Sequence, residues 1–145
     1  DPPADNPQLP PATQTGANTF GCYVNGQLLY PNGGGLNPSL FADYGNGSII
    51  VWATNYFYDE HLNLNFTHVF NDTVFVINNI GYQNFYFRVN SNYYYPDSIR
   101  TGSFNLTKLD SINCIISGTF WFDAIDTTSG NIVEIRDGRF DVKYL

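Results

Sequence analysis

Hydrophobic and polar residues alternate with a period of two along most of the chain after residue 18, in short runs separated by Asn, Gly and Asp. This alternation is typical of β-strands that bury one face and expose the other. No stretch of ten or more residues has the apolar spacing of an amphipathic helix. The pattern therefore predicts an all-β protein.

The first two thirds of the chain contain eight predicted strands. The runs 19–24 and 27–30 flank Asn25-Gly26, a dipeptide that favours the tight type I′ turn of a hairpin. Residues 31–38, with three successive glycines, form a predicted loop. The remaining predicted strands of this part are 40–44, 48–54, 61–69, 73–77, 85–89 and 93–95. The run 73–77 is apolar on both faces, which favours a central place in a sheet, whereas Pro96 ends the last run or marks it as an edge.

The C-terminal third predicts a four-stranded antiparallel meander. Asp110-Ser111 and Asp137-Gly138 are its predicted turns, and Gly118 lies mid-strand on an apolar face, where a bulge, a bend or a close backbone approach is expected. The four strands are 102–109, 112–124, 132–136 and 138–144. The apolar face of the second strand comprises Ile112, Cys114, Ile116, Phe120, Phe122 and Ala124; in the last strand Phe140, Val142 and Tyr144 point inward and Arg139, Asp141 and Lys143 outward.

About ten strands without a confident helix indicate an antiparallel two-layer β-sandwich, with a flattened up-and-down β-barrel as the alternative. The predicted core contains eight phenylalanines: Phe20, Phe66, Phe85, Phe87, Phe104, Phe120, Phe122 and Phe140.

The first 18 residues differ from the rest, because they hold five of the eight prolines and no aromatic residue. Such a segment cannot bury enough apolar surface to offset the entropy of ordering it. We therefore expect residues 1–18 to be a disordered leader or tether and residues 19–145 to be a single β-domain.

Composition limits the function classes. The formal net charge is −7 and only six residues are Lys or Arg, which argues against binding of nucleic acid. The chain has no initiator Met, no apolar signal-like segment and no run of about 18 apolar residues. We expect the mature part of an exported protein that is not integral to a membrane.

The two cysteines, Cys22 and Cys114, leave two alternatives open. An even number in an exported chain permits one disulfide, whereas two buried free thiols produce the same apolar strand pattern.

Residues with catalytic or metal-binding chemistry are few. Asp59-Glu60-His61 concentrates three ligand types, but in a strand the side chain of Glu60 would point to the face opposite to Asp59 and His61. The two histidines, His61 and His68, lie on opposite faces of one predicted strand. Three further acidic residues near the last turns lack the spacing of a calcium loop: Asp123, Asp126 and Asp137. We expect no catalytic site, no metal and no cofactor; an enzyme built around Asp59, Glu60 and His61 is the third-ranked hypothesis.

Two aromatic clusters exceed what the core requires. They are Tyr56-Phe57-Tyr58 and Tyr93-Tyr94-Tyr95. In an extended run of three residues at least one side chain faces away from the core. Exposed tyrosines beside Asn and Asp are suited to stacking on sugar rings or to protein contacts, and cross-strand packing is the alternative. The candidate ligand-binding residues are Tyr56, Tyr58, Tyr93, Tyr94 and Tyr95.

Several motifs resemble a family of uncharacterised exported lipoproteins from Bacteroidetes. In the C-terminal third these are Gly102-Ser103-Phe104, Ile116-Ser117-Gly118-Thr119-Phe120 and Ile135-Arg136-Asp137-Gly138-Arg139-Phe140-Asp141-Val142. At the start they are Leu9-Pro10-Pro11-Ala12-Thr13-Gln14-Thr15-Gly16, Asn18-Thr19-Phe20-Gly21-Cys22 and Val24-Asn25-Gly26. The resemblance implies an all-β domain in the periplasm or on the cell surface, held by an N-terminal lipid whose cysteine would precede residue 1. It implies no activity.

From these observations we expect a non-enzymatic exported lipoprotein domain whose partner is a carbohydrate or a protein. It meets a membrane only through the lipid anchor. The alternative function is a carrier of a small apolar ligand, which requires the sheet to close into a barrel.

Overall fold

The computed structural model describes residues 7–67, 73–81 and 83–144, and within them it contains eleven strands. Six strands form sheet A: β1 (Thr19–Val24), β2 (Gln27–Leu29), β6 (Val74–Ile77), β9 (Gly102–Asp110), β10 (Ile115–Ile125) and β11 (Ile132–Lys143). Five strands form sheet B: β3 (Leu40–Gly45), β4 (Ser48–Asn55), β5 (Glu60–Phe66), β7 (Tyr86–Val89) and β8 (Asn92–Tyr94).

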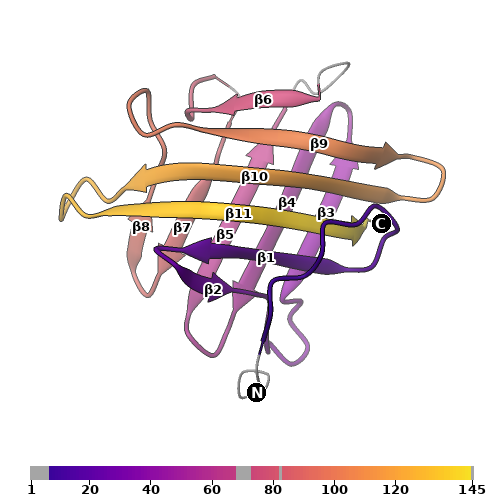
Figure 1. The fold of residues 1–145 in the computed structure, drawn as a ribbon, viewed down its shortest axis with the longest axis horizontal. Coiled ribbons are helices and arrows are strands. Elements are labelled where there is room, and N and C mark those ends of the chain that lie inside the picture. Colours follow the sequence, from indigo (N-terminus) through magenta and orange to yellow (C-terminus); the bar gives the residue numbers. More distant parts are fainter. Residues whose placement is uncertain (1–6, 68–72, 82, 145) are drawn as a thin grey trace.

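The two sheets form the layers of a β-sandwich. The strand order is β2-β1-β11-β10-β9-β6 in sheet A and β3-β4-β5-β7-β8 in sheet B, and all pairings are antiparallel. Figure 1 shows sheet A in front of sheet B, with the strands of the two layers crossing at a steep angle. This confirms the predicted sandwich. The barrel alternative is wrong, because the two sheets remain separate and do not close. No helix of the described residues could span a membrane.

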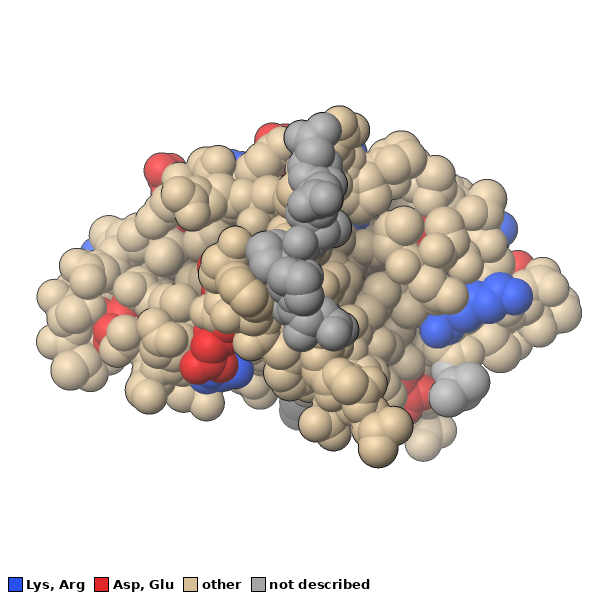
Figure 2. Space-filling view, turned by 90° about the horizontal axis from the view of Figure 1, so that it is seen from below, with Lys and Arg blue, Asp and Glu red and all other residues tan. Residues whose placement is uncertain are grey.

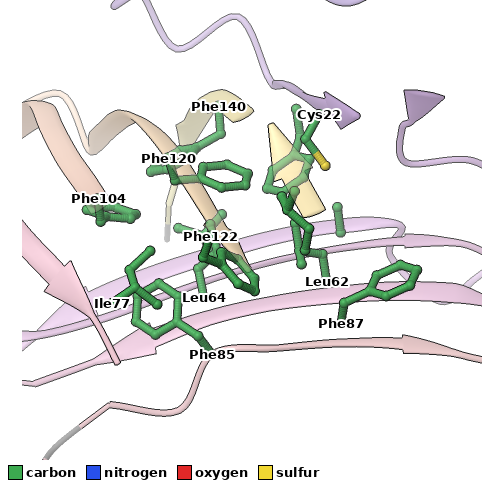
Figure 3. Close-up of a cluster of buried hydrophobic side chains, with 14 of the residues drawn as sticks. Cys22, Leu62, Leu64, Ile77, Phe85, Phe87, Phe104, Phe120, Phe122 and Phe140 are labelled. Carbon is green, nitrogen blue, oxygen red and sulfur yellow. The ribbon is translucent and has the colours of Figure 1, made fainter. Parts of the chain in front are cut away.

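The core fills the space between the sheets with the side chains that the alternation predicts. All eight phenylalanines assigned to the core are at most 3% exposed. Figure 3 shows part of this core, in which phenylalanines of both sheets pack among aliphatic residues. Sheet A contributes Phe104, Phe120, Phe122 and Phe140, and sheet B contributes Phe85 and Phe87. Each fully buried aromatic ring contributes about 1.5–3 kcal/mol of transfer free energy, so this cluster is the main source of stability.

Two local predictions about glycines are confirmed. Asn25 and Gly26 both have positive φ, at 48° and 83°, as a type I′ hairpin turn between β1 and β2 requires. At Gly118 the register of β10 against β9 shifts, and an added Cβ would lie 2.9 Å from Asn105 O and from the Phe140 ring. The glycine therefore marks both a bulge and a close approach.

The predicted central position of the run 73–77 is wrong. Strand β6 pairs only with β9 and forms one edge of sheet A. Val74 and Val76 point outward and are 63% and 60% exposed, while Ile77 is fully buried. Apolar residues on both faces of a short run thus reflect one buried face and one exposed apolar face.

The prediction of a turn at Asp137-Gly138 is also wrong, because β11 continues through these residues as one strand. Asp137 has a positive φ of 55°, and the register against β10 shifts between Phe120 and Phe122. A left-handed residue followed by glycine forms a β-bulge here rather than a hairpin, so the predicted four-stranded meander has three strands. Ile112, assigned to the apolar face of the next strand, lies in the turn before β10 and is 90% exposed.

The N-terminal segment covers a buried carboxylate. Asp141 points to the outer side of sheet A, as predicted, yet it is 0% exposed. Its oxygens accept hydrogen bonds from Thr13 Oγ1 at 2.7 Å and from the backbone N–H groups of Thr15, Gly16 and Ala17 at 2.8–3.1 Å. Residues 13–17 of the predicted leader therefore lie against the outer face of sheet A and hydrogen-bond to it.

The two sheets are joined at one corner. Tyr95, just after β8, forms an isolated antiparallel bridge with Ile125 at the end of β10, with two backbone hydrogen bonds of 2.9 and 3.0 Å. This bridge brings the edge of sheet B beside the loop that connects β10 to β11, and it determines the surroundings of the second tyrosine cluster.

Candidate functional site

A row of aromatic rings crosses the outer face of sheet B. The strand register places one or more rings on each strand, and neighbouring ring centroids lie 5.4–5.8 Å apart from β3 to β8. We call this set the aromatic row; its members are Phe41, Trp52, His61, Tyr86, Tyr93 and Tyr95. Only the last two belong to the predicted candidates.

The free ring surface of the aromatic row is concentrated at its β8 end. The rings of Trp52, His61 and Tyr86 each contact a neighbour on both sides and are only partly exposed. Tyr93 and Tyr95 are each 43% exposed, and their ring planes differ by 10°. The middle of the row therefore mainly stabilises the sheet by cross-strand packing, whereas its end offers aromatic surface to a ligand.

A pocket of about 310 Å³ adjoins Tyr93 and Tyr95 at the corner where the sheets are bridged. We call it the corner pocket. Its other lining residues are polar: Ser91, Asn92, Asp126, Thr127 and Thr128. Asp126 orders one wall, because its carboxylate accepts hydrogen bonds from Thr128 N and Ser129 Oγ at 3.0 Å. The pocket thus combines two aromatic rings with amide and hydroxyl groups.

Tyr94 does not belong to this surface. It is only 8% exposed and its ring packs 6.0 Å from that of Phe87, since alternation turns the middle residue of the cluster toward the core. The structure therefore separates Tyr94 from the exposed rings of Tyr93 and Tyr95.

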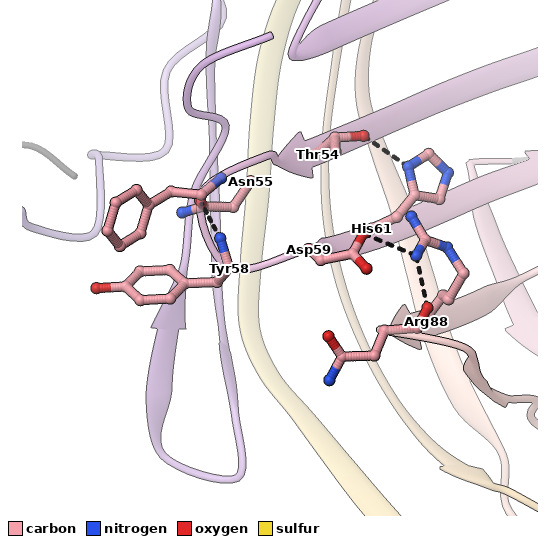
Figure 4. A network of polar contacts seen from close by, with 8 residues as sticks. Thr54, Asn55, Tyr58, Asp59, His61 and Arg88 are labelled. Atoms are coloured by element: carbon pink, nitrogen blue, oxygen red, sulfur yellow. Dashed lines mark hydrogen bonds and ion pairs between the residues drawn. The ribbon is translucent and has the colours of Figure 1, made fainter. Parts of the chain in front are cut away.

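The first cluster lies in the turn between β4 and β5, where Tyr56, Phe57 and Tyr58 are 41%, 53% and 50% exposed. Asn55 Oδ1 orders the turn by accepting hydrogen bonds from the backbone N–H groups of Phe57 and Tyr58 (Figure 4). Tyr56 donates its hydroxyl to Pro38 O at 3.1 Å. Tyr58 lines a groove that shares no residue with the corner pocket, so the two clusters belong to separate surfaces.

Asp59, Glu60 and His61 do not converge on a common point. The Asp59 carboxylate pairs with Arg88 at 3.0 Å, whereas His61 Nδ1 and Thr54 Oγ1 form a hydrogen bond of 2.7 Å (Figure 4). Burial, with a contribution from Arg88, lowers the pKa of His61 to about 4, and burial raises that of Glu60. His61 is therefore a neutral member of the aromatic row at neutral pH.

No group of three His, Cys, Asp or Glu residues in the described ranges could hold a metal ion. Asp123 instead pairs with Arg136 at 2.7 Å, and Asp126 accepts the loop hydrogen bonds already described. His68 lies outside the described residues.

Both cysteines are free thiols in the structure. Cys22 faces the core opposite the bulge at Asp137, and Cys114 precedes Ile115, which pairs with Lys143. Along β11 this separates them by roughly 15–20 Å, too far for a disulfide. Burial also raises the pKa of the Cys22 thiol.

A further pocket, which the sequence did not predict, lies on the outer face of sheet A. Trp121 is 42% exposed and carries the Arg136 guanidinium at 5.2 Å from its ring centroid. Beside it lies a depression of about 320 Å³. One feature of the sequence could have indicated this pocket: Trp121 occupies an outward position in an alternating strand, where polar side chains predominate.

In a comparison with known families, the model of a domain of unknown function (DUF6252) matches residues 39–142. Comparisons with curated proteins and with solved structures found no match.

Proposed function

We propose, starting from the fact that this chain belongs to the DUF6252 family, that it is a non-enzymatic, exported and lipid-anchored domain that binds carbohydrate in the corner pocket. The family description names no activity, so the proposal rests on the chemistry of the surface. The carrier alternative is not retained, because it required a closed barrel.

The observation that carries the proposal is the pairing of Tyr93 and Tyr95 with polar groups in one pocket. A sugar ring has an apolar face of C–H groups and a rim of hydroxyls. The apolar face packs on an aromatic ring, and the hydroxyls exchange hydrogen bonds with amide, carboxylate and hydroxyl groups. Asn92, Thr127 and Thr128 supply such groups beside the two rings.

The volume and the rigidity of the corner pocket suit a ligand the size of a sugar residue. About 310 Å³ lies at the lower end of small-molecule sites. The bridge between Tyr95 and Ile125 and the hydrogen bonds to Asp126 hold the pocket walls before a ligand arrives. A preformed site loses less entropy on binding.

Export and lipid anchoring are supported by the motifs that resemble exported Bacteroidetes lipoproteins. The corner pocket agrees with a neutral partner, because Asp126 is the one charged residue among the described residues that line it. Figure 2 shows that one face of the molecule is made mostly of uncharged residues with scattered acidic and basic groups. A protein partner is the other occupant that such a surface can take, and an array on which no glycan binds would favour it over carbohydrate.

The test is a glycan array with the wild-type protein, followed by calorimetry on the positive glycan with the double variant Tyr93→Ala/Tyr95→Ala. We expect binding to weaken by about tenfold or more, since each lost aromatic contact removes about 0.5–1.5 kcal/mol. The melting temperature should change little, because both side chains are half exposed.

Tyr58→Ala is the matched control, since it removes a similarly exposed tyrosine from a separate groove and should leave the affinity unchanged. An array with no glycan bound, or full affinity in the double variant, contradicts the proposal. A collapse of stability in the double variant would assign these tyrosines to packing instead.

A further inference from the structure

The depression beside Trp121 is built from three neighbouring strands. The register aligns Asn105 on β9, Thr119 on β10 and Arg139 on β11, and it pairs Trp121 with Ser103 in the adjacent row. Small polar side chains thus form a floor between the taller Trp121 and Arg139, which leaves about 320 Å³ of open volume.

The two arginines of this pocket have different surroundings. Arg136 pairs with Asp123 at 2.7 Å and with Glu134 at 3.0 Å, so its charge is compensated and its guanidinium is held over Trp121. It acts as a fixed wall. In a chain with only six Lys and Arg residues, two line this one depression.

Arg139 has no carboxylate partner in an ion pair within the described ranges. Its Nε donates to Asp137 O at 3.1 Å and one terminal nitrogen donates to Pro10 O at 3.2 Å. These neutral carbonyl groups orient the guanidinium without compensating its charge. The bulge at Asp137 and the N-terminal segment therefore position a cation at the edge of the pocket.

We propose that this pocket binds a sugar that carries one carboxylate, such as a uronic acid residue. The carboxylate pairs with Arg139, the ring lies against Trp121, and the hydroxyls bond to Asn105 and Thr119. The exposed Asp137 carboxylate accepts a hydroxyl and disfavours ligands with more than one negative charge. This site lies on the sheet opposite the corner pocket and does not depend on it.

The two tryptophans allow a direct test, because Trp52 lies on sheet B and Trp121 on sheet A. In the variant Trp52→Phe, Trp121 is the single tryptophan, and its fluorescence is titrated with D-galacturonate and with the neutral D-galactose. We expect a saturable change with affinity for galacturonate about tenfold higher, the size of one charge-assisted hydrogen bond, and weaker binding at high salt.

Arg139→Gln should reduce the galacturonate affinity about tenfold, which is the loss of one charge-assisted pair, and leave the melting temperature unchanged. Lys108→Gln is the control, because it removes the same charge from sheet A outside the pocket and should bind normally. Saturation-transfer NMR on the protein with both tryptophans gives the same comparison if Trp52→Phe does not fold.

Equal affinity for galactose and galacturonate, no binding of either, or an equal loss in the Lys108 and Arg139 variants would overturn the proposal. The Tyr93→Ala/Tyr95→Ala variant should retain galacturonate binding, so failure of the corner pocket and failure of this site are distinguishable.

Discussion

His61 lies between the rings of Trp52 and Tyr86, with Thr54 bonded to its Nδ1. These neighbours favour the neutral imidazole, because burial and the nearby Arg88 both oppose protonation. The strand alternation placed His61 correctly on the outer face of its strand. It did not show that aromatic rings from adjacent strands would enclose it, because those neighbours come from distant parts of the chain.

The lowered pKa of His61 makes stability depend on pH in a defined window. Between its ordinary value of 6.5 and about 4, the unfolded chain binds a proton that the folded protein does not. Stability is therefore fully present above pH 6.5 and decreases as the pH falls toward 4. Allowing for solvent screening of this half-buried group, we expect a loss on the order of 1 kcal/mol.

Urea denaturation at several pH values would measure this loss for the wild type and for His61→Phe, which retains a ring in the aromatic row. The variant should have a smaller slope between pH 6.5 and 4. His68 is present in both proteins, so its contribution cancels. The same slope in both would contradict the assignment to His61.

At the scale of elements, β6 and the Asp137-Gly138 bulge show the limit of strand patterns. Alternation identified most of the strands, because it depends only on which side chains face the core. Whether a strand has one neighbour or two, and whether a left-handed dipeptide turns the chain or bulges it, depends on pairing with β9, β10 and β1. Two of these pairings, β6 with β9 and β11 with β1, join strands that do not follow one another in the sequence.

The edge position of β6 predicts contrasting effects of substitution at adjacent residues. Val76→Lys places a charge on the exposed face of an edge strand, and we expect a change in unfolding free energy within about 0.5 kcal/mol. Ile77→Ala removes a fully buried side chain and should cost about 2–4 kcal/mol. Chemical denaturation of both variants measures the difference; a large loss for Val76→Lys would indicate a covered, central strand.

At the scale of the whole molecule, the N-terminal segment and β11 are joined through Asp141. Burial by itself raises the pKa of this carboxyl, but hydrogen bonds from Thr13, Ser117 and the backbone outweigh it and hold the pKa below its usual range. Composition alone assigned this segment to a disordered leader. The attachment depends on a carboxylate more than 120 residues away in the chain.

Two truncations would test this attachment. Deleting residues 1–17 removes the N-terminal donors to Asp141 and leaves only that of Ser117, whereas deleting residues 1–12 leaves all of these donors in place. We expect the longer deletion to be less stable by about 2–4 kcal/mol, since a charged acceptor loses most of its hydrogen bonds. Equal unfolding free energies, measured by denaturant titration, would show that the segment adds no stability.

The sequence by itself determined the all-β class, most strands, the first hairpin and the phenylalanine core, because these follow from local alternation and from residues that favour positive φ. It also identified Tyr93 and Tyr95 as surplus to the core. Only the tertiary structure decided the edge position of β6, the cover over Asp141 and the two pockets. The edge position of β6 and the cover over Asp141 depend on segments distant in sequence, and each pocket needs side chains from more than one strand or loop. The packing of the whole sandwich selects these arrangements.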